Sequence, residues 1–302
     1  MKFLTRILVP LLAACSFTGC LSHTKLDDST GYIRLRPVIG CGTRAGEDYI
    51  AFPEDRTFQL WAISQESGKK FLDDVTVLPK GGRGWYPENT PMWPYGESLK
   101  FIGYYPSELP MTCDKDGILK MASYEVQGSG EDLLVTDPTR SYTKNDSIVG
   151  LPFYHALTKI DFRVLHALNS NTRVRVEKIE ICGIYTRGGF DSSSDLKWSH
   201  AGEPTTLTVF QADGDGAEVF SLTPRILGDS MFVLPQDGGA SIRITYAFST
   251  GGSGWLTGQK MSTPAITSRW EPDRHYTYTL KIQEDRLAYT TGISSWYEDV
   301  QN

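Results

Sequence analysis

Apolar and polar residues alternate with a period of two along much of the chain. The clearest alternation lies between residues 275 and 282, where large apolar side chains occupy every second position. For this segment we expect a buried face of Tyr276, Tyr278, Leu280 and Ile282, and a solvent face of His275, Thr277, Thr279 and Lys281. A period of two is typical of half-buried β-strands. The pattern therefore predicts a protein built mainly of strands.

The same alternation predicts further strands along the whole chain. They span residues 32–36, 57–63, 98–105, 158–164, 174–185, 230–234 and 241–248. Glycine-rich segments, which are typical of turns, separate these strands at residues 81–84, 128–130, 213–216 and 251–254. Many short strands joined by such turns predict an all-β fold made of β-sandwiches.

The length of the chain allows more than one hydrophobic core. It has 302 residues, of which 40% are hydrophobic and 22% are charged, a balance typical of globular proteins. A polar stretch at residues 169–172 interrupts two strand patterns near the middle of the chain. We therefore expect two domains of similar size, at residues 31–168 and 169–302.

The amino terminus has the features of an export signal. Lys2 and Arg6 precede an apolar run at residues 7–12, and small residues follow this run. The run is far shorter than the ~20 residues that a membrane-spanning helix needs. We therefore expect residues 1–19 to be a cleaved lipoprotein signal peptide.

Two cysteines are candidates for lipidation. Residues 16–20 resemble a bacterial lipobox, which would place the lipid on Cys20 and leave residues 20–30 as a linker. Cys15 fits the same consensus but would follow a very short apolar region. Simple secretion without a lipid is the alternative to both.

Charge and motif content argue against several classes of function. The net charge is −6 and no block of lysine or arginine occurs, so we expect no binding of nucleic acid. The five histidines lack metal-binding spacing, and His155, beside apolar Phe153, is expected to be a packed or capping residue. The sequence contains no nucleophile elbow, phosphate-binding loop or dinucleotide fingerprint. We expect no catalytic residues, no metal and no cofactor.

Three cysteines lie beyond the signal segment. Cys41, Cys113 and Cys182 are too far apart in sequence for a paired-cysteine metal or redox motif. In an exported protein Cys41 and Cys113 could form a disulfide, and buried free thiols are the other interpretation.

Aromatic residues suggest a carbohydrate-binding alternative. They make up 12% of the chain, and Trp85, Tyr86, Trp93 and Tyr95 lie in one proline-containing segment. Exposed aromatic faces stack on sugar rings, so this segment could form a platform for a glycan. The competing interpretation is that these side chains fill the core and edges of a sandwich.

Several short motifs occur along the chain in a fixed order. They are Thr-Arg-Ala at 43–45, Trp-Pro at 93–94 followed by a strand at 99–106, Asp-Leu-Leu at 132–134, F-x-H-x-x-x-K at 153–159, Leu-Pro-Gln at 234–236, and Trp270 with Tyr276 and Tyr278. Together these motifs resemble the fimbrillin family, whose members are subunits of Bacteroidetes pili. One departure is Gly103, which stands where the family commonly has alanine.

The resemblance implies a fold, a location and a function. The fold is two transthyretin-like β-sandwich domains in tandem, and the location is the outer membrane and cell surface, reached as a lipoprotein. The implied function is that of a structural or adhesive fimbrial subunit, whose partners are other pilus subunits joined by exchange of a β-strand, with host or bacterial surfaces as possible ligands. Strand exchange is a form of β-augmentation, in which a neighbour's strand completes an open sheet. A surface glycan-binding lipoprotein is the alternative function.

The resemblance also implies proteolytic processing between Arg44 and Ala45. Cleavage there would detach the predicted first strand, at residues 32–39, and uncover a groove. The alternative is that Arg44 is an ordinary loop arginine.

The carboxyl-terminal tail, residues 286–302, is a candidate donor strand. Its alternating residues Leu287, Tyr289, Thr291 and Ile293 share one face, and Trp296 is out of phase with them, which predicts a bulge or turn before it. The alternative is a last strand that pairs within its own sheet.

Two serines are candidate acceptors for O-glycosylation. Ser29 and Ser147 each follow an aspartate, in a pattern that resembles the acceptor sequence of Bacteroidetes. Ordinary turn serines are the alternative.

Overall fold

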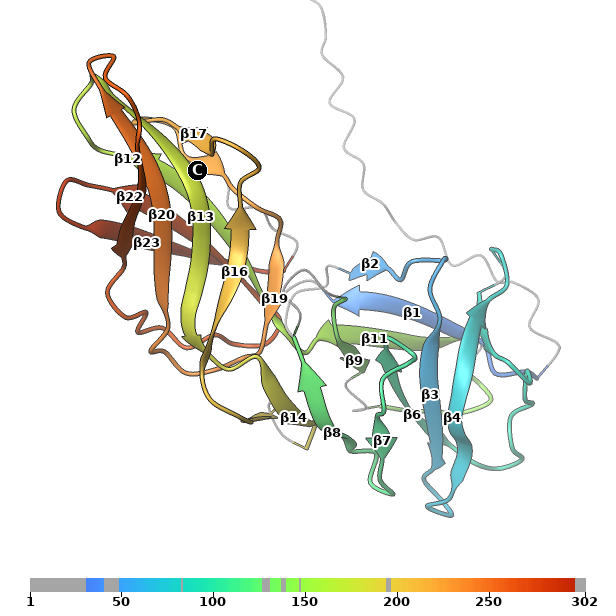
Figure 1. Cartoon of the computed structure of the whole chain (residues 1–302). Coiled ribbons are helices and arrows are strands. Elements are labelled where there is room, and N and C mark those ends of the chain that lie inside the picture. The colour runs from blue at the N-terminus through green and yellow to red at the C-terminus, as the bar shows by residue number, and fades with distance from the viewer. Residues whose placement is uncertain are drawn as a thin grey trace, which may run out of the picture. The chain divides into compact units, whose positions relative to one another are not determined.

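Strands account for all regular structure in the described part of the chain. The structure is a computed structural model that describes residues 31–40, 49–82, 84–126, 131–136, 140–146, 148–193 and 197–296. Within these ranges β1 to β23 follow one another in chain order, and no helix is long and apolar enough to cross a membrane (Figure 1). The predicted fold class, all-β with two β-sandwiches in tandem, is confirmed.

One large sheet in the first half of the chain closes on itself. Across the sheet the order is β10 (Ser141–Tyr142), β6 (Leu99–Tyr105), β3 (Phe58–Ser64), β4 (Lys70–Pro79), β5 (Trp85–Pro87), β1 (Leu35–Gly40), β11 (Val149–His155) and β9 (Leu134–Thr136), with β2 (Tyr49–Ala51) paired to β1. An additional pairing joins β9 to β6. The sheet therefore encloses a core of its own, into which β1, β3, β6 and β11 all send apolar side chains.

Two further sheets form the sandwich of the second half. One has the order β18 (Arg225–Ile226), β12 (Thr158–His166), β22 (Arg274–Ile282) and β23 (Leu287–Ser294), with β19 (Met231–Val233) also paired to β12. The other has the order β16 (Thr205–Gln211), β13 (Thr172–Ile184), β20 (Ser241–Thr250) and β21 (Leu256–Ser262), with β17 (Ala217–Val219) paired to β13.

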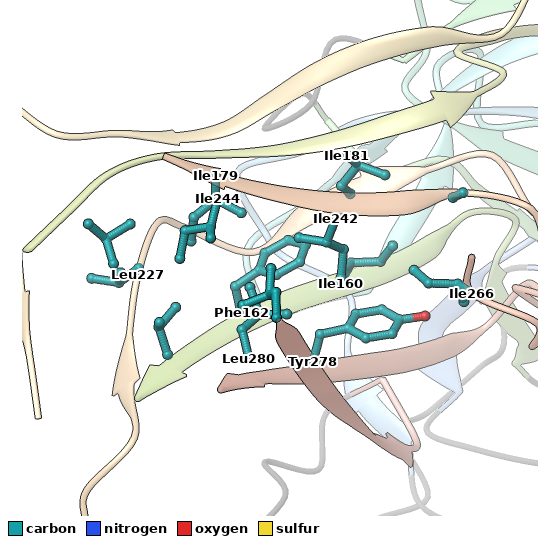
Figure 2. Close-up of a cluster of buried hydrophobic side chains, with 14 of the residues drawn as sticks. Ile160, Phe162, Ile179, Ile181, Leu227, Ile242, Ile244, Ile266, Tyr278 and Leu280 are labelled. Carbon is teal, nitrogen blue, oxygen red and sulfur yellow. The ribbon is translucent and has the colours of Figure 1, made fainter. Parts of the chain in front are cut away.

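The facing sides of these two sheets share one apolar core. Figure 2 shows Phe162 of β12 and Tyr278 of β22 on one side of this core and Ile179 of β13 and Ile244 of β20 on the other. Buried and half-buried residues alternate strictly along β12, as a period-two sequence requires. The core forms because both sheets present one apolar face.

A smaller fourth sheet contains strands from both halves of the sequence. Its order is β15 (Lys197–His200), β14 (Arg187–Asp191), β8 (Leu119–Glu125) and β7 (Thr112–Cys113), and β8 pairs antiparallel with β14. Residues Tyr32–Asn302 accordingly cluster as one compact unit.

Sheet membership changes between β11 and β12. The sequence placed a domain boundary near residue 168, after the strand that the structure identifies as β12. Since β12 pairs along its whole length with β22, it belongs to the second sandwich. A division of the chain at residues 156–157 fits the sheets better.

The predicted solvent face of β22 is wrong at two positions. His275 and Thr277 are buried, whereas the sequence pattern placed both in water. β22 is an inner strand between β12 and β23, and the Nε2 atom of His275 lies 2.6 Å from the Oδ2 atom of Asp161 on β12. A polar partner on the neighbouring strand allows the histidine to be buried.

Candidate functional site

The first strand, β1, lies between strands from distant parts of the chain. It pairs in parallel with β11, from Leu35 opposite Val149 to Ile39 opposite Phe153. On its other side it pairs antiparallel with β2 and, through Leu35, with Trp85 of β5. Figure 1 shows β1 and β11 side by side. If β1 were removed, β11 would gain an unpaired edge.

One face of β1 and of the residues before it is buried in the first core. Alternate positions, namely Ile33, Leu35, Pro37 and Ile39, are buried, and Arg36 between them is exposed. This alternation is the period-two pattern of a strand with one face on a core. The strand is therefore held by its side chains as well as by its backbone.

Two prolines lie in the paired segments of β1 and β11 but leave the bonds between these strands intact. Pro37 lies opposite Leu151, and Pro152 of β11 lies opposite Val38. Because the N–H of Val149 donates to the carbonyl oxygen of Arg34, the donors between the two strands are odd-numbered residues of β11 and even-numbered residues of β1, and neither proline is among them. Parallel pairing is slightly less stable per residue than antiparallel pairing. The buried apolar side chains of β1 therefore add a second attachment to these hydrogen bonds.

Aromatic rings line the space under β1. Phe58 and Phe153 meet edge to face, with ring centroids 5.1 Å apart, and Phe52 contacts Trp85 in the same way at 5.4 Å. These rings belong to the same core as the buried residues of β1. The side chains of β1 therefore pack among these rings, and removal of β1 would leave an apolar groove.

The buried side chains of β1 and its approach make a large contribution to stability. Burial of one large aliphatic side chain contributes ~1.5–3 kcal/mol, so Ile33, Leu35 and Ile39 together contribute roughly 5–9 kcal/mol as an upper estimate. The net stability of a folded domain is only about 5–15 kcal/mol. Because the two quantities are comparable, loss of β1 alone would strongly destabilise the first half of the chain.

Several predicted site residues lie outside the described residues. These are the lipidation candidates Cys15 and Cys20, the processing site at Arg44 and Ala45, and the glycosylation candidates Ser29 and Ser147. In sequence, Arg44 follows the last residue of β1 by four positions. A cut there would separate β1 from all the strands that follow.

The candidate donor tail forms β23 in its own sheet. All eight residues of β23 pair antiparallel with β22, from Leu287 opposite Ile282 to Ser294 opposite His275. Leu287 is buried, Tyr289 packs against the second core, Thr291 is half-buried and Ile293 is exposed. In this single chain the tail thus pairs within its own sheet, which is the alternative to a donor strand. Donation to a neighbour would require β23 to leave β22.

Trp296 lies beyond the end of β23 and is buried. Its indole stacks on the ring of His155, with centroids 3.8 Å apart and planes at 11°, and on the ring of Phe232 at 5.4 Å. Trp296 belongs to a third apolar cluster that draws on both halves of the sequence, and Phe232 packs against this cluster. Trp296, two residues beyond the end of β23, therefore packs against residues of β11 and β19.

Two carboxylates lie beside His155, in a cluster that the sequence analysis did not predict. The Nδ1 atom of His155 bonds the carboxylate of Asp132, and the backbone N–H of His155 donates to the carboxylate of Asp273. Burial raises the pKa of Asp273 to about 6, and the negative charge of Asp132 adds to this, while His155 and Arg274 act in the opposite direction. Asp132, His155 and Asp273 come from segments far apart in sequence, and Arg274 directly follows Asp273.

The aromatic segment at residues 85–95 does not form a continuous platform. Trp85 is buried in the first core, and Trp93 packs against this core with its ring 5.9 Å from Phe101. Tyr95 alone among the four predicted residues is fully exposed. The glycan-binding alternative thereby loses the observation that suggested it.

The described cysteines and acidic residues offer no reactive or metal-binding site. Cys113 and Cys182 are free thiols, and burial raises the pKa of Cys113 to about 11, which keeps this thiol protonated. Cys41 lies outside the described residues. Where the structure describes the chain, no group of three or more histidine, cysteine, aspartate or glutamate side chains could hold a metal ion.

A sequence model of one protein family matches most of the chain. The fimbrillin-like family matches residues 43–296, from the Thr-Arg-Ala motif to Trp296. The chain belongs to the fimbrillin-like family. The resemblance inferred from the short motifs is confirmed.

Solved structures of bacterial surface proteins share the fold of this fimbrillin-like chain. A fimbrial protein from Bacteroides vulgatus has a TM-score of 0.57 at 14% identity, covering 87% of this chain and 99% of its own. A cell adhesion protein from Bacteroides uniformis has a TM-score of 0.55 at 16% identity, covering 89% and 99%. One from Bacteroides ovatus has a TM-score of 0.54 at 14% identity, covering 89% and 98%. A comparison with curated protein sequences finds no match.

Two fimbrillin motifs that are separate in sequence meet in the fold. Asp132 of the Asp-Leu-Leu motif bonds His155 of the F-x-H-x-x-x-K motif, because β9 pairs with β11.

Gly103, which stands where the family commonly has alanine, has a packing reason. A Cβ atom there would lie 3.1 Å from the carbonyl oxygen of Gln59 and 3.3 Å from the ring of Phe153, so the glycine gives Phe153 its space.

Proposed function

We propose that this chain is a subunit of a bacterial surface pilus that assembles by strand exchange, with β1 as the strand that is replaced. The supporting observation is the state of β1, whose apolar side chains pack among aromatic rings and whose pairing with β11 is parallel. Membership in the fimbrillin-like family supports a fimbrial role, and the relatives are fimbrial and adhesion proteins and not enzymes.

Cleavage after Arg44 is the step that prepares the groove in this proposal. The cut leaves β1 attached only by non-covalent contacts. A strand from a neighbouring subunit then pairs with β11 and places apolar side chains where Leu35 and Ile39 lay. Such a donor needs apolar residues at every second position, as in the tail at residues 286–302.

Export as a lipoprotein is the second part of the proposal. The basic residues, the apolar run and the lipobox that ends at Cys20 support it, and it would carry the chain to the outer membrane and cell surface. Mass spectrometry of the mature amino terminus tests it. A lipid on Cys20 is expected, and an unmodified mature terminus contradicts it.

Substitution of the processing arginine tests strand exchange. Arg44→Ala should abolish the ladder of polymers seen when surface material is run on gels without boiling, because β1 would stay covalently attached. Arg36→Ala is the matched control, since Arg36 is an exposed arginine of β1 itself. A polymer ladder from Arg44→Ala equal to that of the unsubstituted chain would refute the proposed order of steps.

A further inference from the structure

A small exposed apolar surface lies where the described chain begins. It consists of Tyr32, Met92 and Tyr95, which are 40%, 58% and 103% exposed, and we refer to it as the Tyr95 face. Tyr32 and Met92 are joined by a β-bridge, and the N–H of Ile33 donates to the carbonyl oxygen of Pro91 at 3.0 Å. Tyr95 follows Met92 by three residues.

The fold holds these side chains outward. Ile33 is fully buried, so Tyr32 before it points away from the core, and Trp93 packs against Phe101 of the core while Met92 before it does not. Pro91 and Pro94 fix the φ angles on both sides of Trp93. All three side chains of the Tyr95 face are therefore exposed outside the core, and Tyr95 is fully exposed.

The segment that leads to Met92 carries one lysine and one exposed glutamate. The Nζ atom of Lys80 donates to Thr90 at 2.9 Å and lies 5.0 Å from the ring centroid of Tyr86. Glu88 is exposed in the same loop and carries the opposite charge. Tyrosine and lysine side chains are enriched where proteins meet lipid headgroups, because each combines an apolar body with a polar end.

The covalent connection of the chain points to a lipid surface as the partner of this face. Cys20, the proposed lipidation site, precedes Tyr32 by 12 residues, which even fully extended span no more than about 43 Å. In an anchored chain Tyr32 thus never lies farther than this from the lipidated residue, so weak interfacial contacts act at a raised effective concentration.

We infer that the Tyr95 face rests on the headgroup region of the membrane that holds the lipidated amino terminus. The inference rests on the proposed lipoprotein export and concerns the chain before any cleavage after Arg44. Contact with lipid orients the uncleaved subunit on the surface, and cleavage after Arg44 separates Tyr32 and the anchor from the rest of the face.

Photocrosslinking to lipid tests this contact. The intact lipidated chain is reconstituted in vesicles of phosphatidylethanolamine and phosphatidylglycerol, with a photoreactive benzoyl-phenylalanine in place of Tyr95. The matched control carries the same residue in place of Phe71, an aromatic residue of β4 that is also exposed. Phe71 lies nine positions before Lys80, roughly 30 Å along the strand. Both sites are exposed, so neither replacement removes core packing.

The yield of lipid adducts, measured by mass spectrometry, gives the outcome. Severalfold more lipid adduct is expected at position 95 than at position 71, and replacement of both Tyr32 and Met92 by serine should reduce the yield at position 95. Equal yields at the two positions overturn the inference while leaving the lipid anchor intact. Adducts to a second copy of the chain in place of lipid also overturn it and assign the face to a subunit contact. Failure of the chain to float with the vesicles contradicts lipoprotein export itself and the inference with it.

Discussion

The indole of Trp296 lies parallel to the imidazole of His155, with ring centroids 3.8 Å apart. His155 ends β11, the strand that pairs with β1, and Trp296 follows β23, the last strand of the second sandwich. One stacked pair therefore connects the end of β11 with the candidate donor tail.

Truncation of this indole should destabilise the chain strongly. Trp296→Ala removes a buried aromatic side chain and is expected to cost ~3–5 kcal/mol in the free energy of unfolding. Trp255→Ala is the matched control, because Trp255 is half-buried against Arg173 and Arg175 and should cost about 1 kcal/mol. Denaturant unfolding measures both values. If both variants lose the same free energy of unfolding, the stacked pair contributes no more to stability than the contact of Trp255 with its arginines.

The carboxyl-terminal deletion separates the two interpretations of the tail. Removal of residues 292–302 eliminates Trp296 and the pairing of Gly292 with Thr277, so a marked fall in the melting temperature of the monomer is expected. A chain that ends at Trp296 keeps both features and is the control. An unchanged melting temperature after the longer deletion would favour a tail that serves only as a donor.

The pKa of Asp273 predicts a pH-dependent effect of one substitution. The pKa of the Asp273 carboxyl is 3.8 in the unfolded chain and about 6 in the folded one. Between these pH values the folded state therefore binds more protons than the unfolded state. Stability therefore falls as the pH rises from about 4 through about 6. Asp273→Asn cannot ionise, and asparagine tolerates the φ of 59° at this position.

The expected result is a difference that appears only at higher pH. Near neutral pH Asp273→Asn should be more stable than the unsubstituted chain by ~1–3 kcal/mol, and near pH 4 the two should be about equally stable. Thermal unfolding at both pH values measures this. A gain of the same size at both would mean that the effect does not come from ionisation.

Neighbouring residues of β1 should differ sharply in their contribution to stability. Leu35→Ala creates a cavity in the aromatic groove and is expected to cost ~2–5 kcal/mol in the uncleaved chain. Arg36→Ala alters an exposed side chain of the same strand and should change the stability by less than about 0.5 kcal/mol. A small effect of Leu35→Ala on unfolding by denaturant would show that β1 does not fill the groove.

Local sequence patterns predicted the strands that have one apolar face and missed others. β20 and β22 carry apolar residues at every second position, and the prediction located both. β21 is mostly exposed and β14 contains two glycines, so neither has the apolar alternation that identifies a strand. The pairing of such strands depends on neighbours that the local sequence does not show.

Contacts between distant segments explain what the sequence did not show at the site. The bond between Asp132 and His155 depends on the pairing of β9 with β11, and the burial of His275 depends on Asp161 of β12. Motif resemblance marked Asp132 and His155 without indicating that they meet. Asp273 had no local signal, because its raised pKa arises from burial against segments far away in sequence.

The mass of subunits taken from assembled filaments tests the central proposal most directly. If β1 is replaced during assembly, mass spectrometry of these subunits should find an amino terminus at Ala45 and no peptide from residues 20–44. Filaments whose subunits retain residues 20–44 would contradict the replacement of β1.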